Sequence, residues 1–209
     1  MILYDHPASG NCMKARILLR QLELPYERVQ VDLFKGDTRT PEHFGRNPDG
    51  RIPVLELDDG QTIPESGAIL GYLADGTEYL PTDRLARARV LQWMLFEQNR
   101  IEAELAYARF LRLSGRAGQM PEVFENRLDR GRDALVALDR GLSDGRDFIV
   151  GDYSIADIAL YAYVHCAADA GAELGPHEAL AGWLGRVEAT PRFENDLEPL
   201  PAHALQRPV

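Results

Sequence analysis

Cysteine is scarce in this chain of 209 residues, which contains only two, Cys12 and Cys166. They lie far apart, form no Cys-x-x-Cys pair, and the 5 histidines show no spacing typical of metal ligands. These patterns predict neither a structural disulfide nor a metal site. We expect two reduced thiols, as is usual for a cytoplasmic protein.

Long apolar runs and an excess of basic residues are also missing. No stretch approaches the roughly 18 apolar residues that span a bilayer, and the N-terminus lacks the pattern of a secretory signal. The chain has 23 Lys and Arg against 33 Asp and Glu, a net charge of −10. Binding nucleic acid over a broad surface requires clustered Lys and Arg. We therefore expect a cytoplasmic protein that binds neither nucleic acid nor membrane.

The first third of the chain alternates short strand patterns with helical spacing. Four runs predict strands and two predict longer helices: strands at 1–5, 26–33, 52–57 and 61–63, helices at 12–22 and 66–74. A crossover through a helix makes the first two strands parallel, and a two-strand hairpin is antiparallel. The pattern predicts an α/β domain with a mixed four-stranded sheet.

Strand patterns end near residue 80, and the rest of the chain is helical. Four helices are predicted, at 83–113, from Pro121, from Ser154 and at 177–190. The segment 76–83, GTEYLPTD, separates the two patterns. SIAD at 154–157 matches a capping box, to which we assign a structural role. The second domain is therefore predicted to be an all-α helical bundle.

The turn HPASGNCMK, between the first strand and the first helix, contains three groups that could do chemistry. These are Ser9, Cys12 and Lys14. A helix start leaves backbone N–H groups without partners, so the turn is also suited to a polar ligand.

Two further segments combine helix or strand signals with candidate binding groups. Glu65 precedes Ser66 at a helix start, which predicts either a simple cap or a site for a small carboxylate beside its ammonium group. Ile52 precedes Pro53, and a cis bond there would turn the backbone of Ile52 outward. Only about 5–6% of X–Pro bonds are cis, so the pattern leaves both isomers open.

Three segments carry a resemblance to the cytosolic glutathione transferases: 3–19 (LYDHPASGNCMKARILL), 47–73 (NPDGRIPVLELDDGQTIPESGAILGYL) and 148–164 (FIVGDYSIADIALYAYV). The chain is similar to a serine-type, bacterial-like member of that superfamily, with its class unassigned. The resemblance implies three parts: a thioredoxin-like domain at 1–76, a linker at 77–83 and a helical domain at 84–209 that supplies the electrophile site. It also implies a cytoplasmic homodimer that acts in detoxification.

The same resemblance implies glutathione as co-substrate, without a metal. Glu65 and Ser66 fall where the family holds the γ-glutamyl group. The backbone of Ile52 falls where it pairs with the cysteinyl part, and Pro53 is the family's cis proline.

The resemblance also implies which residues face the glycyl carboxylate and the thiol of glutathione. Lys35 and Arg51 lie near the position of residues that face the glycyl carboxylate. Serine-type members place the catalytic serine two residues after a proline and three before a cysteine, and Ser9 has this relation to Pro7 and Cys12. Ser9 is thus expected to stabilise the glutathione thiolate, which attacks a small hydrophobic electrophile.

Two other functions stay open at this stage. Cys12 lies in the first turn of a helix, which lowers a thiol pKa, so the protein could be a glutathione-dependent disulfide reductase. Alternatively, the chain could be a non-catalytic module for binding or dimerisation. Tyr4 lies inside the first strand and is not expected to replace Ser9.

Overall fold

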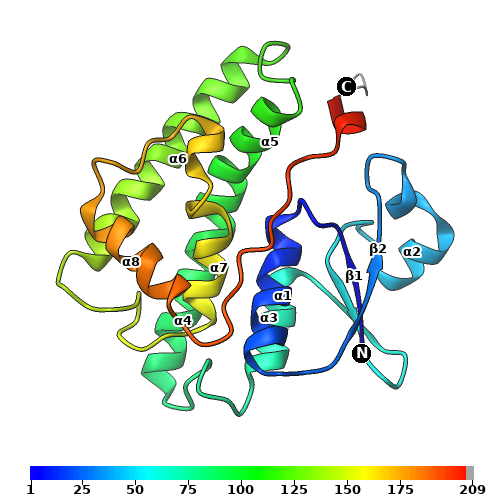
Figure 1. The fold of residues 1–209 in the computed structure, drawn as a ribbon, viewed down its shortest axis with the longest axis horizontal. Helices are drawn as coiled ribbons and strands as arrows, with labels where there is room; N and C mark the ends of the chain where they lie inside the picture. Colours follow the sequence, from blue (N-terminus) through cyan, green and yellow to red (C-terminus); the bar gives the residue numbers. More distant parts are fainter. Residues whose placement is uncertain (206–209) are drawn as a thin grey trace. The chain divides into compact units, whose positions relative to one another are not determined.

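The computed structural model describes residues 1–205, which form two compact units (Figure 1). The first comprises Met1–Asp75 and the C-terminal residues from Pro191 onward. The second comprises Gly76–Thr190. Of the described helices, none is long and apolar enough to cross a bilayer.

The first unit is a four-stranded sheet in the order β2-β1-β3-β4. Strand β1 pairs parallel with β2 and antiparallel with β3, and β3 pairs antiparallel with β4. This confirms the mixed sheet and the thioredoxin-like arrangement predicted from the sequence. The elements of this unit are β1 (Ile2–Asp5), α1 (Gly10–Gln21), β2 (Glu27–Gln30), η1 (Asp37–Arg39), α2 (Pro41–Arg46), β3 (Val54–Glu56), β4 (Thr62–Pro64), α3 (Ser66–Ala74) and η4 (Ala202–Leu205).

Nearly all residues of helix α1 are buried. Ile17, Leu18 and Leu19 are consecutive and all fully buried, although an amphipathic surface helix would expose one of three neighbours. The strands contribute Leu3 and Leu55, also fully buried. The turn that precedes α1 is therefore attached to the most rigid element of the unit.

The C-terminal segment packs on α1 of the first unit. Arg16, fully buried, forms ion pairs with Asp5 of β1 (2.6 Å) and with Asp196 (2.8 Å). The backbone N–H of Glu198 donates to the carbonyl of Pro7 (3.2 Å). Figure 1 shows this segment, coloured orange to red, running beside α1. The predicted domain 84–209 is thus corrected, because its last residues belong to the first unit.

The second unit is helical, as predicted. The periodic segment 83–113 is one continuous run, but it includes a π-helical stretch that the sequence pattern did not reveal. The elements are α4 (Arg84–Phe96), η2 (π-helical, Glu97–Ala106), α5 (Tyr107–Leu113), α6 (Pro121–Leu142), α7 (Ile155–Val164), η3 (Ala167–Ala170) and α8 (Glu178–Glu188). The buried carboxylate of Glu104 in η2 forms ion pairs with Arg127 and Arg130 of α6, both at 2.8 Å. These ion pairs hold the π-helical stretch against α6.

The predicted capping box at the start of α7 is confirmed. The Ser154 hydroxyl oxygen accepts the backbone N–H of Asp157, and the Asp157 carboxylate accepts the backbone N–H of Ser154. The carboxylate of Asp157 also accepts from the N–H of Ile149 and from Nε1 of Trp183, both at 2.9 Å. Burial raises the pKa of Asp157 and these donated hydrogen bonds oppose the rise. One buried carboxylate therefore joins α7, α8 and the segment before α7.

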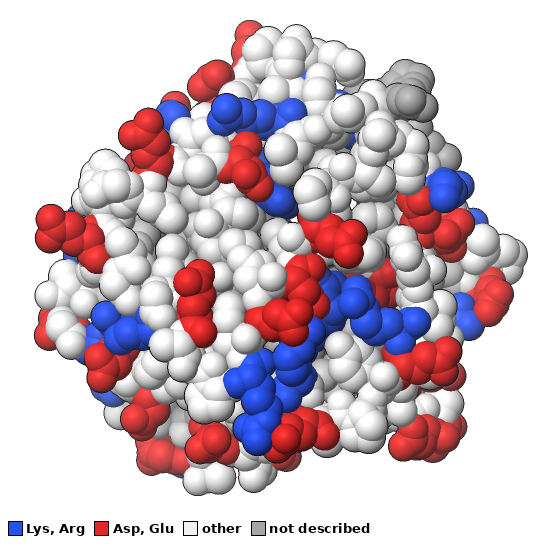
Figure 2. Space-filling model, viewed as in Figure 1, with Lys and Arg blue, Asp and Glu red and all other residues white. Residues whose placement is uncertain are grey.

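On the face drawn in Figure 2, basic and acidic side chains are interspersed, and a basic band across the middle of the view is bordered by acidic groups. Several basic groups of the first unit are held in ion pairs. Arg20 pairs with Glu194 and Asp196, both at 3.3 Å, and Arg28 pairs with Asp5 at 2.6 Å. The basic groups of this unit thus serve partly to bind its own acidic groups.

Replacing Asp196 with Asn should loosen the C-terminal segment. Burial alone would raise the pKa of Asp196, but the hydrogen bond and charge of Arg16 hold it below its usual value. The carboxylate therefore stabilises the fold above its unfolded pKa of about 3.9, and this contribution is lost as the pH falls through the lowered folded pKa. We expect Asp196→Asn to lower the free energy of unfolding at pH 7 by about 1–3 kcal/mol, measured in urea.

The matched control is Asp133→Asn, because Asp133 is exposed on α6 and surface changes rarely exceed about 0.5 kcal/mol. The difference between wild type and Asp196→Asn should shrink below pH 4. Equal stability of wild type and Asp196→Asn at pH 7 would show that this ion pair does not hold the segment.

Candidate functional site

The turn between β1 and α1 is organised around Ser9. Its hydroxyl oxygen accepts the backbone N–H of Cys12 at 3.3 Å, which makes Ser9 the N-cap of α1. Its own N–H donates to the carbonyl of His6 at 3.0 Å. A hydroxyl group has one proton to donate in addition to its lone pairs. The capping bond uses a lone pair, so the hydroxyl proton remains for a second partner, which is the Cys12 sulfur in this structure or a bound ligand.

A pocket of about 280 Å³ opens beside this turn, entirely within the first unit. It brings the turn together with the loop after β2 and the loop before β3. Three of the residues predicted from the sequence line it, namely Ser9, Arg51 and Ile52. The full lining consists of Ser9, Leu33, Thr38, Arg39, Gly50, Arg51 and Ile52.

Ile52 contributes its backbone to this pocket. The Ile52–Pro53 bond is cis, as the resemblance implied. Neither the N–H nor the C=O of Ile52 bonds another group within residues 1–205. The preceding carbonyl, that of Arg51, is held by Asn47 and by the His43 ring, both at 3.0 Å. A fixed loop thus presents one unpaired donor and one unpaired acceptor, which an extended peptide can satisfy.

Two arginines make the pocket cationic. Arg51 is exposed and pairs with Asp49 at 2.5 Å. Arg39 donates to the backbone carbonyl of Asp49 at 3.3 Å, and no carboxylate among residues 1–205 pairs with it. Its guanidinium therefore has donors left for an anionic group, to which arginine binds strongly.

Gly50 allows these loops to approach each other. Its φ is +65°, a conformation that side chains other than glycine's rarely adopt. A Cβ there would lie 2.7 Å from Nη1 of Arg39, 2.8 Å from Cε1 of Phe44 and 2.9 Å from the carbonyl oxygen of Thr38. The positive φ and the crowding explain why this position holds glycine.

Glu65 and Ser66 lie at the start of α3. Ser66 is buried and is the first helical residue, one position later than the expected cap. Its hydroxyl donates to Oδ1 of Asn11 at 3.4 Å, so the starts of α1 and α3 are linked. Glu65 occupies the cap position without a side-chain capping bond, at φ 73° and ψ 118°. Such a conformation costs a residue other than glycine about 1–3 kcal/mol and is most frequent at functional sites.

Lys35 is not brought to the pocket. Its ammonium pairs with Asp32 at 3.2 Å, and Asp32 also bonds Nε2 of His203 at 2.8 Å. Thr38 and Arg39 line the pocket instead, and sequence reasoning missed both. The only signal for Arg39 was a second basic residue in the same loop as Lys35.

Cys12 is buried in the core below the turn. It is fully buried, and burial together with the charge of Asp5 raises the pKa of its thiol to about 12, although the Ser9 hydroxyl opposes this. Burial also raises the pKa of Cys166 to about 11. Cys12 is thus a packed thiol, whereas Cys166 is only half-buried. Residues 1–205 contain no cluster of three or more His, Cys, Asp or Glu side chains suited to a metal ion.

Known proteins resemble this chain in both units. Residues 1–75 match the family model described as the glutathione S-transferase N-terminal domain. Glutathione S-transferase 2 of Saccharomyces cerevisiae is 30% identical over 213 residues, covering 95% of this chain and 90% of the yeast protein.

Solved structures give the same picture. A glutathione S-transferase from Pseudomonas fluorescens Pf-5 superposes with a TM-score of 0.91 at 43% identity, over 94% of this chain and 98% of that one. A glutathione transferase family member from the same organism, solved with two glutathione bound, has a TM-score of 0.79 at 28% identity, over 91% and 89% of the two chains.

Replacing Gly50 with Ala tests whether the pocket depends on this glycine. We expect a loss of about 1–3 kcal/mol in the free energy of unfolding, because the positive φ and the fixed Thr38 carbonyl both oppose a side chain. Urea denaturation measures the loss.

Gly45→Ala in α2 is the matched control, since nothing lies within 4 Å of a Cβ there. Alanine in a helix should stabilise this position by up to about 1 kcal/mol. If both variants were equally stable, the crowding at Gly50 would not constrain the loops.

Proposed function

Because the chain belongs to the cytosolic glutathione S-transferase family, we propose that it is an enzyme that conjugates glutathione to a small hydrophobic electrophile. The observation that carries the proposal is that Ser9, Arg51 and Ile52 line one and the same pocket. These residues come from separate parts of the chain, and each suits a different part of one tripeptide.

The role of Ser9 is to stabilise a sulfur anion. A free thiol with a pKa of about 8.5 is mostly protonated at pH 7. A hydrogen bond from a hydroxyl to a charged partner contributes about 1.5–3 kcal/mol, which corresponds to about one to two pKa units. The positive end of the α1 dipole adds a smaller contribution. In the reaction the thiol proton leaves to solvent, and the sulfur then bonds to the electrophilic carbon as its leaving group departs.

The peptide part of glutathione suits the remaining groups. The unpaired N–H and C=O of Ile52 would pair with the cysteinyl backbone, in front of Pro53. The carboxylate of Glu65 would face the ammonium of the γ-glutamyl group, and the start of α3 at Ser66 would receive its carboxylate. Glutathione bound in a related structure supports glutathione as the ligand.

The glycyl carboxylate needs a cation. The sequence-based candidates are Lys35 and Arg51, and both have carboxylate partners of their own. Arg39 has none among the described residues and lines the pocket. We therefore assign this role to Arg39 together with Arg51, and Lys35 acts with Asp32 at a distance from the lining.

A cytoplasmic homodimer acting in detoxification is part of the same proposal. Leu91 and Leu95 lie one turn apart on α4 and are 46% and 63% exposed. Exposed apolar side chains that lie next to each other are found at association surfaces. Leu91 and Leu95 therefore support a second copy of the chain as the partner.

The disulfide-reductase alternative depends on Cys12. A redox nucleophile must be an accessible thiolate, whereas Cys12 is fully buried with its pKa raised to about 12. The sequence around Cys12 offers no second cysteine as a resolving partner, since the other one is Cys166. Conjugation is the better-supported activity.

Replacing Ser9 with Ala should raise the pKa of bound glutathione by about one to two units. Turnover below that pKa should then fall about 10- to 100-fold. The pH dependence of kcat/KM with a chromogenic aryl halide measures both effects.

Three comparisons make this experiment decisive. Ser9→Thr keeps the hydroxyl and the helix cap and should restore most of the activity, whereas Ser143→Ala alters an exposed serine and should change nothing. An unaltered pH profile in Ser9→Ala would remove Ser9 from the role. Retention on immobilised glutathione without any conjugation would favour the non-catalytic module.

Neither thiol of the folded protein should react with Ellman's reagent at pH 8. A pKa of about 12 leaves roughly 10⁻⁴ of Cys12 as thiolate at that pH. Cys166→Ser provides a variant whose only thiol is Cys12. It should react in denaturant and stay unreactive when folded. Rapid reaction of the folded variant would instead restore the reductase function.

A further inference from the structure

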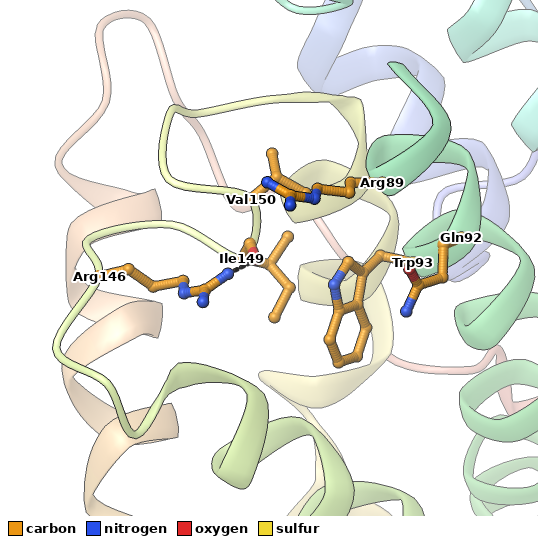
Figure 3. A pocket seen from close by; sticks show the side chains of 6 residues that line it. All are labelled: Arg89, Gln92, Trp93, Arg146, Ile149 and Val150. Atoms are coloured by element: carbon orange, nitrogen blue, oxygen red, sulfur yellow. Dashed lines mark hydrogen bonds between the residues drawn. The ribbon is translucent and has the colours of Figure 1, made fainter. Parts of the chain in front are cut away.

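A second pocket lies wholly within the helical unit and shares no residue with the site described above. Its volume is about 280 Å³. Helix α4 forms one wall, and the segment between α6 and α7 forms the other (Figure 3). The lining residues are Arg89, Gln92 and Trp93 on α4, and Arg146, Ile149 and Val150 on the segment before α7.

The apolar floor of this pocket is held rigidly. The Trp93 ring packs directly on the backbone of α6, since a Cβ on Gly141 would lie 2.8 Å from its Cη2. On another side it makes an edge contact with Phe96, with ring centroids 5.1 Å apart. Ile149 is fully buried, and its N–H bonds the buried carboxylate of Asp157. The floor is therefore preformed for a flat apolar group.

The polar groups around this floor are donors. Arg146 is fixed by Asp144 and by the carbonyl of Ile149 at 3.2 Å. Arg89 is exposed, and no ion pair or hydrogen bond engages it within residues 1–205. The indole N–H of Trp93 has no hydrogen-bond acceptor there either, and in Figure 3 its nitrogen lies on the ring edge facing Ile149.

None of the six lining residues is acidic. The charge of Arg146 is balanced by Asp144, so the unbalanced charge is that of Arg89. An arginine with free donors binds a carboxylate through charge-assisted hydrogen bonds. A pocket with an apolar floor and a few convergent polar groups is the usual form of a small-molecule site, and this volume suits a ligand of about one ring.

We propose that this pocket binds a small aromatic carboxylate, whose ring packs on Trp93 and whose carboxylate is held by Arg89. The indole N–H of Trp93 supplies a further donor. The site belongs to the helical unit alone, so it is occupied independently of glutathione.

The two tryptophans of the chain allow a direct test. In ¹⁵N-labelled protein, each gives one indole N–H resonance, and Trp93→Phe identifies the signal of Trp93. Titration with benzoate should shift the Trp93 signal and leave that of the buried Trp183 unmoved. Benzamide, which has the ring without the charge, and inorganic phosphate, which has the charge without the ring, should each bind more weakly.

Arg89→Gln should weaken benzoate binding about tenfold or more, since a hydrogen bond to a charged group is lost. Arg84→Gln, an exposed arginine on the same helix outside the pocket, is the matched control and should bind as wild type. Ser9→Ala should also bind benzoate normally, which separates this proposal from the conjugation activity.

The remaining outcomes would overturn the proposal. Equal binding of benzamide would show an apolar cavity without anion recognition, and equal binding of phosphate would show charge recognition without a ring site. An unmoved Trp93 signal, or unchanged affinity in Arg89→Gln, would exclude the pocket as the site.

Discussion

The first unit depends on one fully buried cation, the guanidinium of Arg16. Removing one partner of such a buried pair costs about 3–5 kcal/mol, because a charge is left without compensation. Arg16 avoids that cost by binding Asp5 at the end of β1 and Asp196 in the C-terminal segment. Its third contact, 3.4 Å to the carbonyl of Pro7, is with the turn itself. The position of Ser9, two residues later, follows from this network.

Local chemistry explains why much of the fold could be predicted from the sequence. Strand and helix periods and the capping box at Ser154 depend on neighbouring residues, and the structure has the predicted elements with somewhat different bounds. Helix α6 begins at Pro121 as its first-turn proline indicates. The π-helical stretch Glu97–Ala106 could not be predicted, because it follows the same apolar period as an α-helix.

In the candidate site, too, features set by neighbouring residues could be predicted, and features set by distant residues could not. Ser9 and Ile52 were predicted from their neighbours in the sequence, and the structure places both in the lining of one pocket. Arg39 was missed, since its availability depends on which carboxylates pair with other cations, and Lys35 was placed too near the pocket for the same reason. Charge pairing is a property of the folded structure, and the docking of residues after Pro191 on α1 is another case of it.

That docking has a consequence for the order in which the chain is made. Arg16 and Asp196 are 180 positions apart, so the N-terminal residues leave the ribosome long before their last partner is translated. A nascent first unit therefore holds Arg16 with Asp5 alone until the end of synthesis. A chain that ended before Asp196 would lack part of the first unit, and Arg16 would keep Asp5 as its carboxylate partner.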